Sequence, residues 1–375
     1  MAKTAAEAPP SVSRDDLAGP EGLDRNRVRS RLLVLIAIVV VVVLVVTLVP
    51  GLASLRDRFE QAKPGWIVAG TVLKLLSGLC YVAVFRAVFC ARMSWRMSYR
   101  IGMAELGANA LVPTGGAGGL ALGAWALQRG GVPGTVIARR SVAFFLLTSL
   151  PNVAALILVS ALLALHAVPG HANLALTLIP IAAAILAILG TLATGRLADA
   201  LRRRAEQRHG IESTRVRVLA ALAEGVSESL RMLRRHDPTL LLGLIGYLAF
   251  DVMVLWACFH AFGPTPPLAI IWIAYLIGEL GGLIPVPGGI GGVDLGLVGA
   301  FVLYGVPVGA ATAAVLAYRA IALWVPAVFG GAAFVSLRRA LRGEADRIAC
   351  CGPDDELEVI GRGRVRIGAS TQSAG

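Results

Sequence analysis

The chain has 375 residues, of which 57% are hydrophobic and only 15% are charged, and its formal net charge is +12. A soluble domain is closer to half apolar and a quarter charged, so this composition excludes an ordinary soluble protein and indicates a membrane protein. The basic residues gather in alternate segments between apolar blocks. That is the positive-inside pattern of membrane proteins, and it argues against a nucleic-acid partner.

The first predicted elements are a tail and a span. Residues 1–31 are polar and rich in arginine, which predicts a disordered cytosolic tail. Residues 32–49 are long enough to cross a bilayer core of about 30 Å at about 1.5 Å per residue. We expect a retained span, since the block is longer than the apolar core of a signal peptide. Five further apolar blocks predict spans at about 66–91, 141–165, 172–194, 239–262 and 309–336.

Two similar segments interrupt this pattern, ELGANALVPTGGAGG at 105–119 and ELGGLIPVPGGIGG at 279–292. Their prolines and glycines are poorly suited to an uninterrupted helix. If 101–127 crossed the membrane once, the ten basic residues of 196–235 would lie outside the cell. If it enters and returns to the same side, all the basic segments stay inside, so charge favours a re-entrant hairpin. The same reasoning predicts a second hairpin at 268–303, entered from the outside.

An odd number of spans separates the two hairpins, so the second is expected to be inverted relative to the first. Met103–Pro133 and Ile277–Pro307 match without a gap at 11 of 31 positions, at an offset of 174 residues. We therefore predict an all-α polytopic fold of about six spans and two inverted re-entrant hairpins, built on an internal inverted repeat. The hairpin breaks are assigned to Pro113, Gly115, Gly116, Gly118, Gly119, Pro285, Pro287, Gly288, Gly289, Gly291 and Gly292.

The expected domain organisation follows from these elements. A transmembrane domain covers 32–336, and a cytosolic tail covers 337–375. Within the domain, the first repeat takes about 66–165 and the second about 239–336. The segment between them, 195–238, is cytosolic. Its part 196–235 alternates arginine and glutamate with apolar residues, which predicts an amphipathic helix attracted to anionic lipid of the inner leaflet.

Broken helices at membrane depth indicate a cavity. Their unpaired backbone groups are tolerated only inside protein or beside water. Two hairpins inserted from opposite faces would supply such a cavity near the midplane, as in many transporters. The second half-helix of each hairpin would point its N-terminus into the cavity, where it favours an anion such as phosphate. The simpler alternative for any single glycine is close helix packing.

Charged residues inside spans are the sharpest candidates for function. A carboxylate at the centre of a spanning helix costs about 2.5–3.5 kcal/mol on insertion scales, so it is rarely idle. We expect Glu105 and Glu279 to pair with arginines, for which Arg86, Arg140 and Arg319 are the candidates and Arg319 is the most convincing; the alternative is a purely structural ion pair. Lys74 and Asp251 also lie in spans, with no role assigned to them. The candidate transport-path residues are Glu105, Asn109, Thr114, Arg140, Glu279, Asp294 and Arg319.

Asp294 opens the second half-helix of the second hairpin, where it either caps that helix or lines the path. The five histidines lack metal-ligand spacing, and no serine has a G-x-S-x-G setting. We therefore expect no metal, no cofactor and no catalytic activity.

At ELGGLIPVPGGIGGVDLGLVGAF, followed by YGVP and a later YRA, the sequence resembles a flippase-like integral membrane family. The family is named after the transmembrane region of lysylphosphatidylglycerol synthase, the multiple peptide resistance factor. The resemblance covers roughly 32–336. The family typically carries a glutamate where Asp294 stands, and the matching position of the first hairpin is Leu120, without charge.

The resemblance implies movement of a phospholipid or a lipid-linked (polyprenyl-phosphate) head group between leaflets of the bacterial inner membrane. It does not imply lysyl transfer, since only 39 residues follow the last span and a synthase domain needs far more. Two alternatives stay open. One is a membrane-embedded transferase, and the other is a non-catalytic or transferase-associated subunit of a cell-envelope lipid or glycan pathway. Both termini are expected in the cytoplasm.

Overall fold

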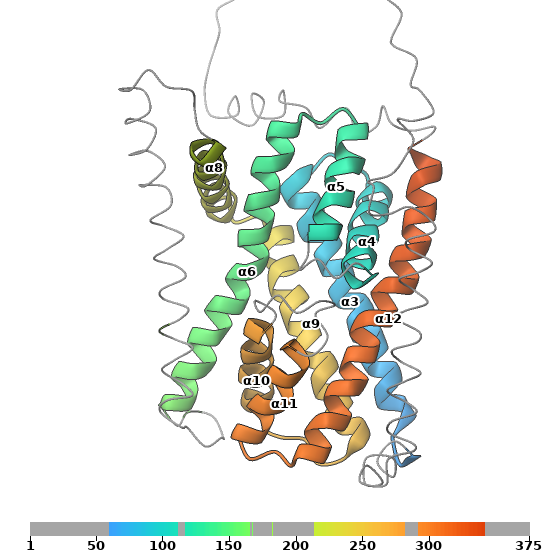
Figure 1. Cartoon of the computed structure of the whole chain (residues 1–375), viewed down its shortest axis with the longest axis vertical. Coiled ribbons are helices and arrows are strands. Elements are labelled where there is room, and N and C mark those ends of the chain that lie inside the picture. The colour runs from blue at the N-terminus through green and yellow to red at the C-terminus, as the bar shows by residue number, and fades with distance from the viewer. Residues whose placement is uncertain are drawn as a thin grey trace, which may run out of the picture.

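The structure is a computed structural model that describes residues 60–111, 117–165, 167, 182, 214–281 and 292–341. Throughout these residues the regular structure is helical, as Figure 1 shows. Four of the described helices are long and apolar enough to cross a membrane: α3 (Pro64–Phe89), α6 (Gly134–Ala164), α9 (Pro238–Phe262) and α12 (Val308–Ala340). The protein is therefore a polytopic membrane protein, and the part of it that the structure describes is all-helical.

Two of the six predicted spans, 32–49 and nearly all of 172–194, lie outside the described residues, as does the N-terminal tail. The other four correspond to α3, α6, α9 and α12. The largest difference is at the start of α6, which begins at Gly134 rather than near 141. Arg139 and Arg140 therefore lie in the first two turns of a long helix, where arginine can extend its guanidinium toward the membrane surface.

Helices α3 and α9 form the centre of the bundle. The N–H of Lys63 donates to the carbonyl of Ala261 at 3.0 Å, which ties the start of α3 to the end of α9. Further along, a Cβ on Gly243 would lie 3.2 Å from the Cys80 carbonyl, so glycine lets the two backbones approach closely. In a membrane the hydrophobic effect does not drive helices together, and small residues allow the close packing that holds them instead.

Two pairs of shorter helices occupy opposite ends of the molecule. The first pair is α4 (Trp95–Leu111) and α5 (Ala117–Arg129), and the second is α10 (Leu268–Gly281) and α11 (Gly292–Leu303). In Figure 1, α4 and α5 lie in the upper half, whereas α10 and α11 lie in the lower half. Each pair thus reaches only part of the way along the long helices.

Most of the predicted break residues lie outside the described part of the chain, including Pro113 and both predicted prolines of 285–287, and so does the transport-path candidate Thr114. Three of the glycines are described. Gly118 and Gly119 lie in the first turn of α5, and Gly292 is the first residue of α11. These three glycines therefore belong to the second helix of each pair and not to the break before it.

The turns that follow α5 and α11 have the same geometry. Gly131 and Gly305 both adopt the left-handed conformation, with φ of 81° and 83°. In the first turn the N–H of Val132 donates to the Leu127 carbonyl at 3.1 Å, and in the second Val306 donates to Phe301 at 2.9 Å. This is the Schellman arrangement, which needs a residue free to take positive φ.

Helix α8 (Thr214–Arg234) covers the later part of the predicted amphipathic segment 196–235 and packs against α6. It lies at the end of the molecule that also holds α4 and α5 (Figure 1). Gly225 faces Val142 of α6, and Glu228 is nearly buried with its carboxylate 3.0 Å from Arg231. One face of α8 therefore packs against α6.

Candidate functional site

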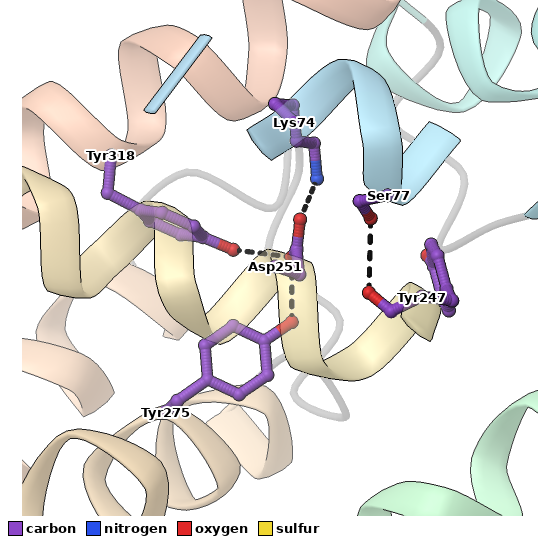
Figure 2. Close-up of polar contacts among 6 residues, drawn as sticks. All are labelled: Lys74, Ser77, Tyr247, Asp251, Tyr275 and Tyr318. Atoms are coloured by element: carbon purple, nitrogen blue, oxygen red, sulfur yellow. Dashed lines mark hydrogen bonds and ion pairs between the residues drawn. The ribbon is translucent and has the colours of Figure 1, made fainter. Parts of the chain in front are cut away.

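The carboxylate of Asp251 is the centre of a polar network deep in the bundle (Figure 2). Its Oδ1 forms an ion pair with the ammonium of Lys74 on α3. Its Oδ2 accepts hydrogen bonds from the hydroxyl of Tyr275 on α10 at 2.8 Å and from that of Tyr318 on α12 at 3.0 Å. Asp251 itself lies near the middle of α9 and is 6% exposed. One carboxylate thus joins four helices.

Lys74 and Asp251 have no role that the sequence alone predicts, and their pairing appears only in the structure. The two residues are 177 positions apart, so no local pattern relates them. A signal was nevertheless present: each is a charge of opposite sign within a different apolar span. Because a buried charge without a partner is strongly destabilising, two such charges in neighbouring spans are expected to meet.

A second ion pair joins α11 to α12. The guanidinium Nε of Arg319 lies 3.0 Å from Oδ1 of Asp294, and the two side chains keep 30% and 21% of their surface exposed. Asp294 lies in the first turn of α11, where the helix dipole also favours a negative charge. The prediction paired Arg319 with Glu279; the ion pair is instead with Asp294.

Glu279 lies on α10 one turn after Tyr275, and its side chain is exposed. The charges of Asp251, Lys74 and Arg319 all act on it. We call Lys74, Asp251, Glu279, Asp294 and Arg319 the central charge cluster. Its members come from five different helices, and its formal charge with every group ionised is −1.

Glu105 is separate from this cluster. It is 1% exposed on α4, and its carboxylate accepts a hydrogen bond from the Tyr81 hydroxyl of α3 at 3.0 Å. The carboxylate lies directly against Gly123 of α5, where a Cβ would collide with it. Tyr81 and the absence of a side chain at Gly123 therefore hold a carboxylate between three helices.

The arginines expected to neutralise Glu105 have other partners. The guanidinium of Arg140 donates to the Phe89 carbonyl. The Nε of Arg86 donates to the Met93 carbonyl at 2.8 Å, and its guanidinium lies 4.7 Å from the ring centroid of Trp95. Arg140 thus binds the last residue of α3 and Arg86 binds the turn that follows it, near one end of the bundle.

Asn109 has a structural role that its sequence position did not reveal. Its Oδ1 accepts a hydrogen bond from the backbone N–H of Gly119 at 2.7 Å, so a side chain of α4 caps the start of α5. A Cβ on Gly119 would lie 2.6 Å from that Oδ1. Asn109 and Gly119 together bring the two helices of the first pair into contact.

Comparison with known proteins places this geometry in a family. No curated protein matches the chain. Residues 34–330 match the family described as the lysylphosphatidylglycerol synthase TM region. The matched range contains the central charge cluster, Glu105 and both helix pairs, and it covers most of the chain. The protein therefore belongs to the lysylphosphatidylglycerol synthase transmembrane-region family.

Proposed function

We propose that the protein moves the head group of a phospholipid, or of a lipid-linked polyprenyl-phosphate substrate, between leaflets of the bacterial inner membrane. The observation that carries this proposal is the central charge cluster. Three charged side chains, Lys74, Asp251 and Arg319, lie within helices long enough to span a membrane, and Glu279 and Asp294 join them from the short helices α10 and α11. Arg319 and Asp294 keep 30% and 21% of their side-chain surface exposed. Charges at that depth are costly, which favours a role on a substrate path.

The proposed membrane arrangement makes each short helix pair a re-entrant hairpin, with the two inserted from opposite faces. The placement of α4 and α5 against α10 and α11 in Figure 1 supports it. The matching turns at Gly131 and Gly305, exactly one repeat offset apart in sequence, support an inverted internal repeat. Both termini and 196–235 then lie in the cytoplasm, where anionic lipid would attract the basic segment.

Arg319 is the proposed ligand of the lipid phosphate. Its guanidinium is partly exposed, and arginine binds phosphate through paired hydrogen bonds. In the structure, the Asp294 carboxylate forms an ion pair with that guanidinium. We propose that the substrate phosphate displaces the Asp294 carboxylate as the head group enters. The excess negative charge of the cluster would then be balanced by a proton or by a cationic group of the substrate. No catalytic step is part of this proposal.

Reconstitution tests the proposal. Proteoliposomes carrying a head-group-labelled fluorescent phospholipid are exposed to a membrane-impermeant quencher, and the fraction of protected label is followed with time. We expect the wild-type protein to move label between leaflets and Arg319→Gln to lose that activity. Arg338→Gln, on the same helix but outside the cluster, is the matched control and should stay active.

Equal activity of Arg319→Gln and Arg338→Gln would overturn the assignment of the site. Lack of lipid movement by the folded wild-type protein, tested with both phospholipid and polyprenyl-phosphate substrates, would contradict the transport function itself. That second result would favour a non-catalytic subunit of an envelope pathway.

A further inference from the structure

A hollow of about 450 Å³ lies between α4 and α12, away from the central charge cluster. The first two turns of α4 and the last third of α12 form its walls. It lies at the end of the molecule where α3 and α12 finish and where α8 is found (Figure 1). Its lining residues are Trp95, Arg96, Tyr99, Arg100, Phe329, Ala332, Ala333 and Ser336.

The shape of the hollow follows from the sequence of α12. Three of the α12 residues that line it are alanine or serine, whose small side chains leave space between the two helices, and three other lining residues, Trp95, Tyr99 and Phe329, are aromatic. Trp95 and Phe329 are 53% and 39% exposed, which is unusual for large apolar side chains in water but ordinary at a membrane interface. The stacking of Arg86 on Trp95 holds one wall in place.

The polar side chains of the hollow suit a phosphate group. Arg96 and Arg100 are four residues apart on α4, so they lie on the same helix face and both line the hollow. The hydroxyls of Tyr99 and Ser336 add hydrogen-bonding groups, and no acidic residue is among the lining residues. Two guanidinium groups beside hydroxyls are typical of phosphate recognition.

We propose that this hollow binds the phosphate of an anionic phospholipid, with the acyl chains lying along Trp95 and Phe329. The combination of arginine and exposed aromatic residues favours a lipid over free phosphate, because an inorganic ion would not cover the apolar surface of the aromatic rings. Since the hollow shares no residue with the central charge cluster, this site does not depend on the proposed transport function. Lipid bound there would join α4 to α12.

Thermal unfolding in an uncharged detergent tests the site, because a ligand that binds only the folded protein raises its unfolding midpoint. The probes are dihexanoyl phosphatidylglycerol, dihexanoyl phosphatidylcholine and inorganic phosphate. We expect a saturable rise with phosphatidylglycerol, a smaller one with phosphatidylcholine, and none with phosphate at the same concentration. Arg319→Gln removes the proposed phosphate ligand of the cluster, and the saturable rise that remains in that variant is the part due to the hollow.

Two variants address the hollow directly. Arg96→Gln/Arg100→Gln removes both cations, and Ser336→Phe fills the space while keeping the charge. Each should need roughly tenfold more phosphatidylglycerol for the same rise, a loss of about 1.4 kcal/mol in binding free energy. Arg338→Gln/Arg339→Gln changes the net charge equally on exposed residues outside the hollow and should respond as the wild type does.

Three results would overturn the proposal. They are a wild-type response in Ser336→Phe, an equal loss in the Arg338→Gln/Arg339→Gln control, and an equal rise with inorganic phosphate. If the double arginine variant does not fold, the response of Ser336→Phe beside that of the wild type decides the question.

Discussion

At the scale of single residues, the polar interior is organised by pairs that join distant parts of the chain. Asp251 binds Lys74 and two tyrosines, Arg319 binds Asp294, and Glu105 accepts a hydrogen bond from Tyr81. The sequence indicated which charges lie in the membrane, because each interrupts an apolar block. It did not indicate their partners, since ion pairing depends on which helix faces meet. We expected Arg319 to pair with Glu279, whereas in the structure it pairs with Asp294.

The Lys74–Asp251 pair provides a stability prediction. Lys74→Met leaves the Asp251 carboxylate buried without its cation, and we expect a loss of about 3–5 kcal/mol in unfolding free energy. Lys74→Met/Asp251→Asn removes both charges and should recover most of that loss. Chemical unfolding in detergent micelles measures both. A single variant as stable as the wild type would show that the pair does not stabilise the fold.

At the scale of elements, glycine determines how closely the helices cross. Gly107 of α4 and Gly330 of α12 meet so closely that a Cβ on Gly107 would lie 2.8 Å from the Gly330 Cα. The sequence predicted the broken helices and their approximate bounds from proline, glycine and charge. It did not predict that Gly107 contacts α12 or that Asn109 caps α5, because both depend on the angle between helices.

Neighbouring glycines of α12 test this crossing. A Cβ on Gly330 would lie 2.6 Å from the Gly107 Cα, whereas one on Gly331 meets nothing within 4 Å. Gly330→Ala should therefore cost about 1–3 kcal/mol, the usual range for overpacking. Gly331→Ala is the matched control and should be neutral or slightly stabilising, since alanine favours a helix. Equal melting temperatures for the two variants would contradict the close approach of α4 and α12.

At the scale of the whole molecule, the two short helix pairs lie at opposite ends of a bundle of long helices, with the central charge cluster formed by α3, α9, α10, α11 and α12 (Figure 1). Charge distribution alone predicted hairpins of opposite orientation. The structure adds that the turns at Gly131 and Gly305 have the same backbone conformation. A sequence comparison aligns these two glycines but does not give their conformation. The distribution of basic residues predicts which end faces the cytoplasm.

Single-cysteine labelling measures that orientation. In a cysteine-free background, cysteines replacing Arg129 and Gly305 are exposed in intact cells to a membrane-impermeant maleimide. We expect label at position 305 and none at position 129 until the membrane is opened. Equal labelling of the two positions in intact cells would contradict the oppositely inserted hairpins.

We propose that the central charge cluster acts in lipid transport and does not merely hold the helices together. Lipid movement in proteoliposomes, measured for Asp294→Asn/Arg319→Gln beside the wild type, tests it most directly. Removing both charges leaves neither uncompensated, so the double variant should keep a melting temperature close to that of the wild type. We expect this stable variant to move no lipid, because the proposed ligand of the phosphate is gone. A double variant that moves lipid at the wild-type rate would contradict it.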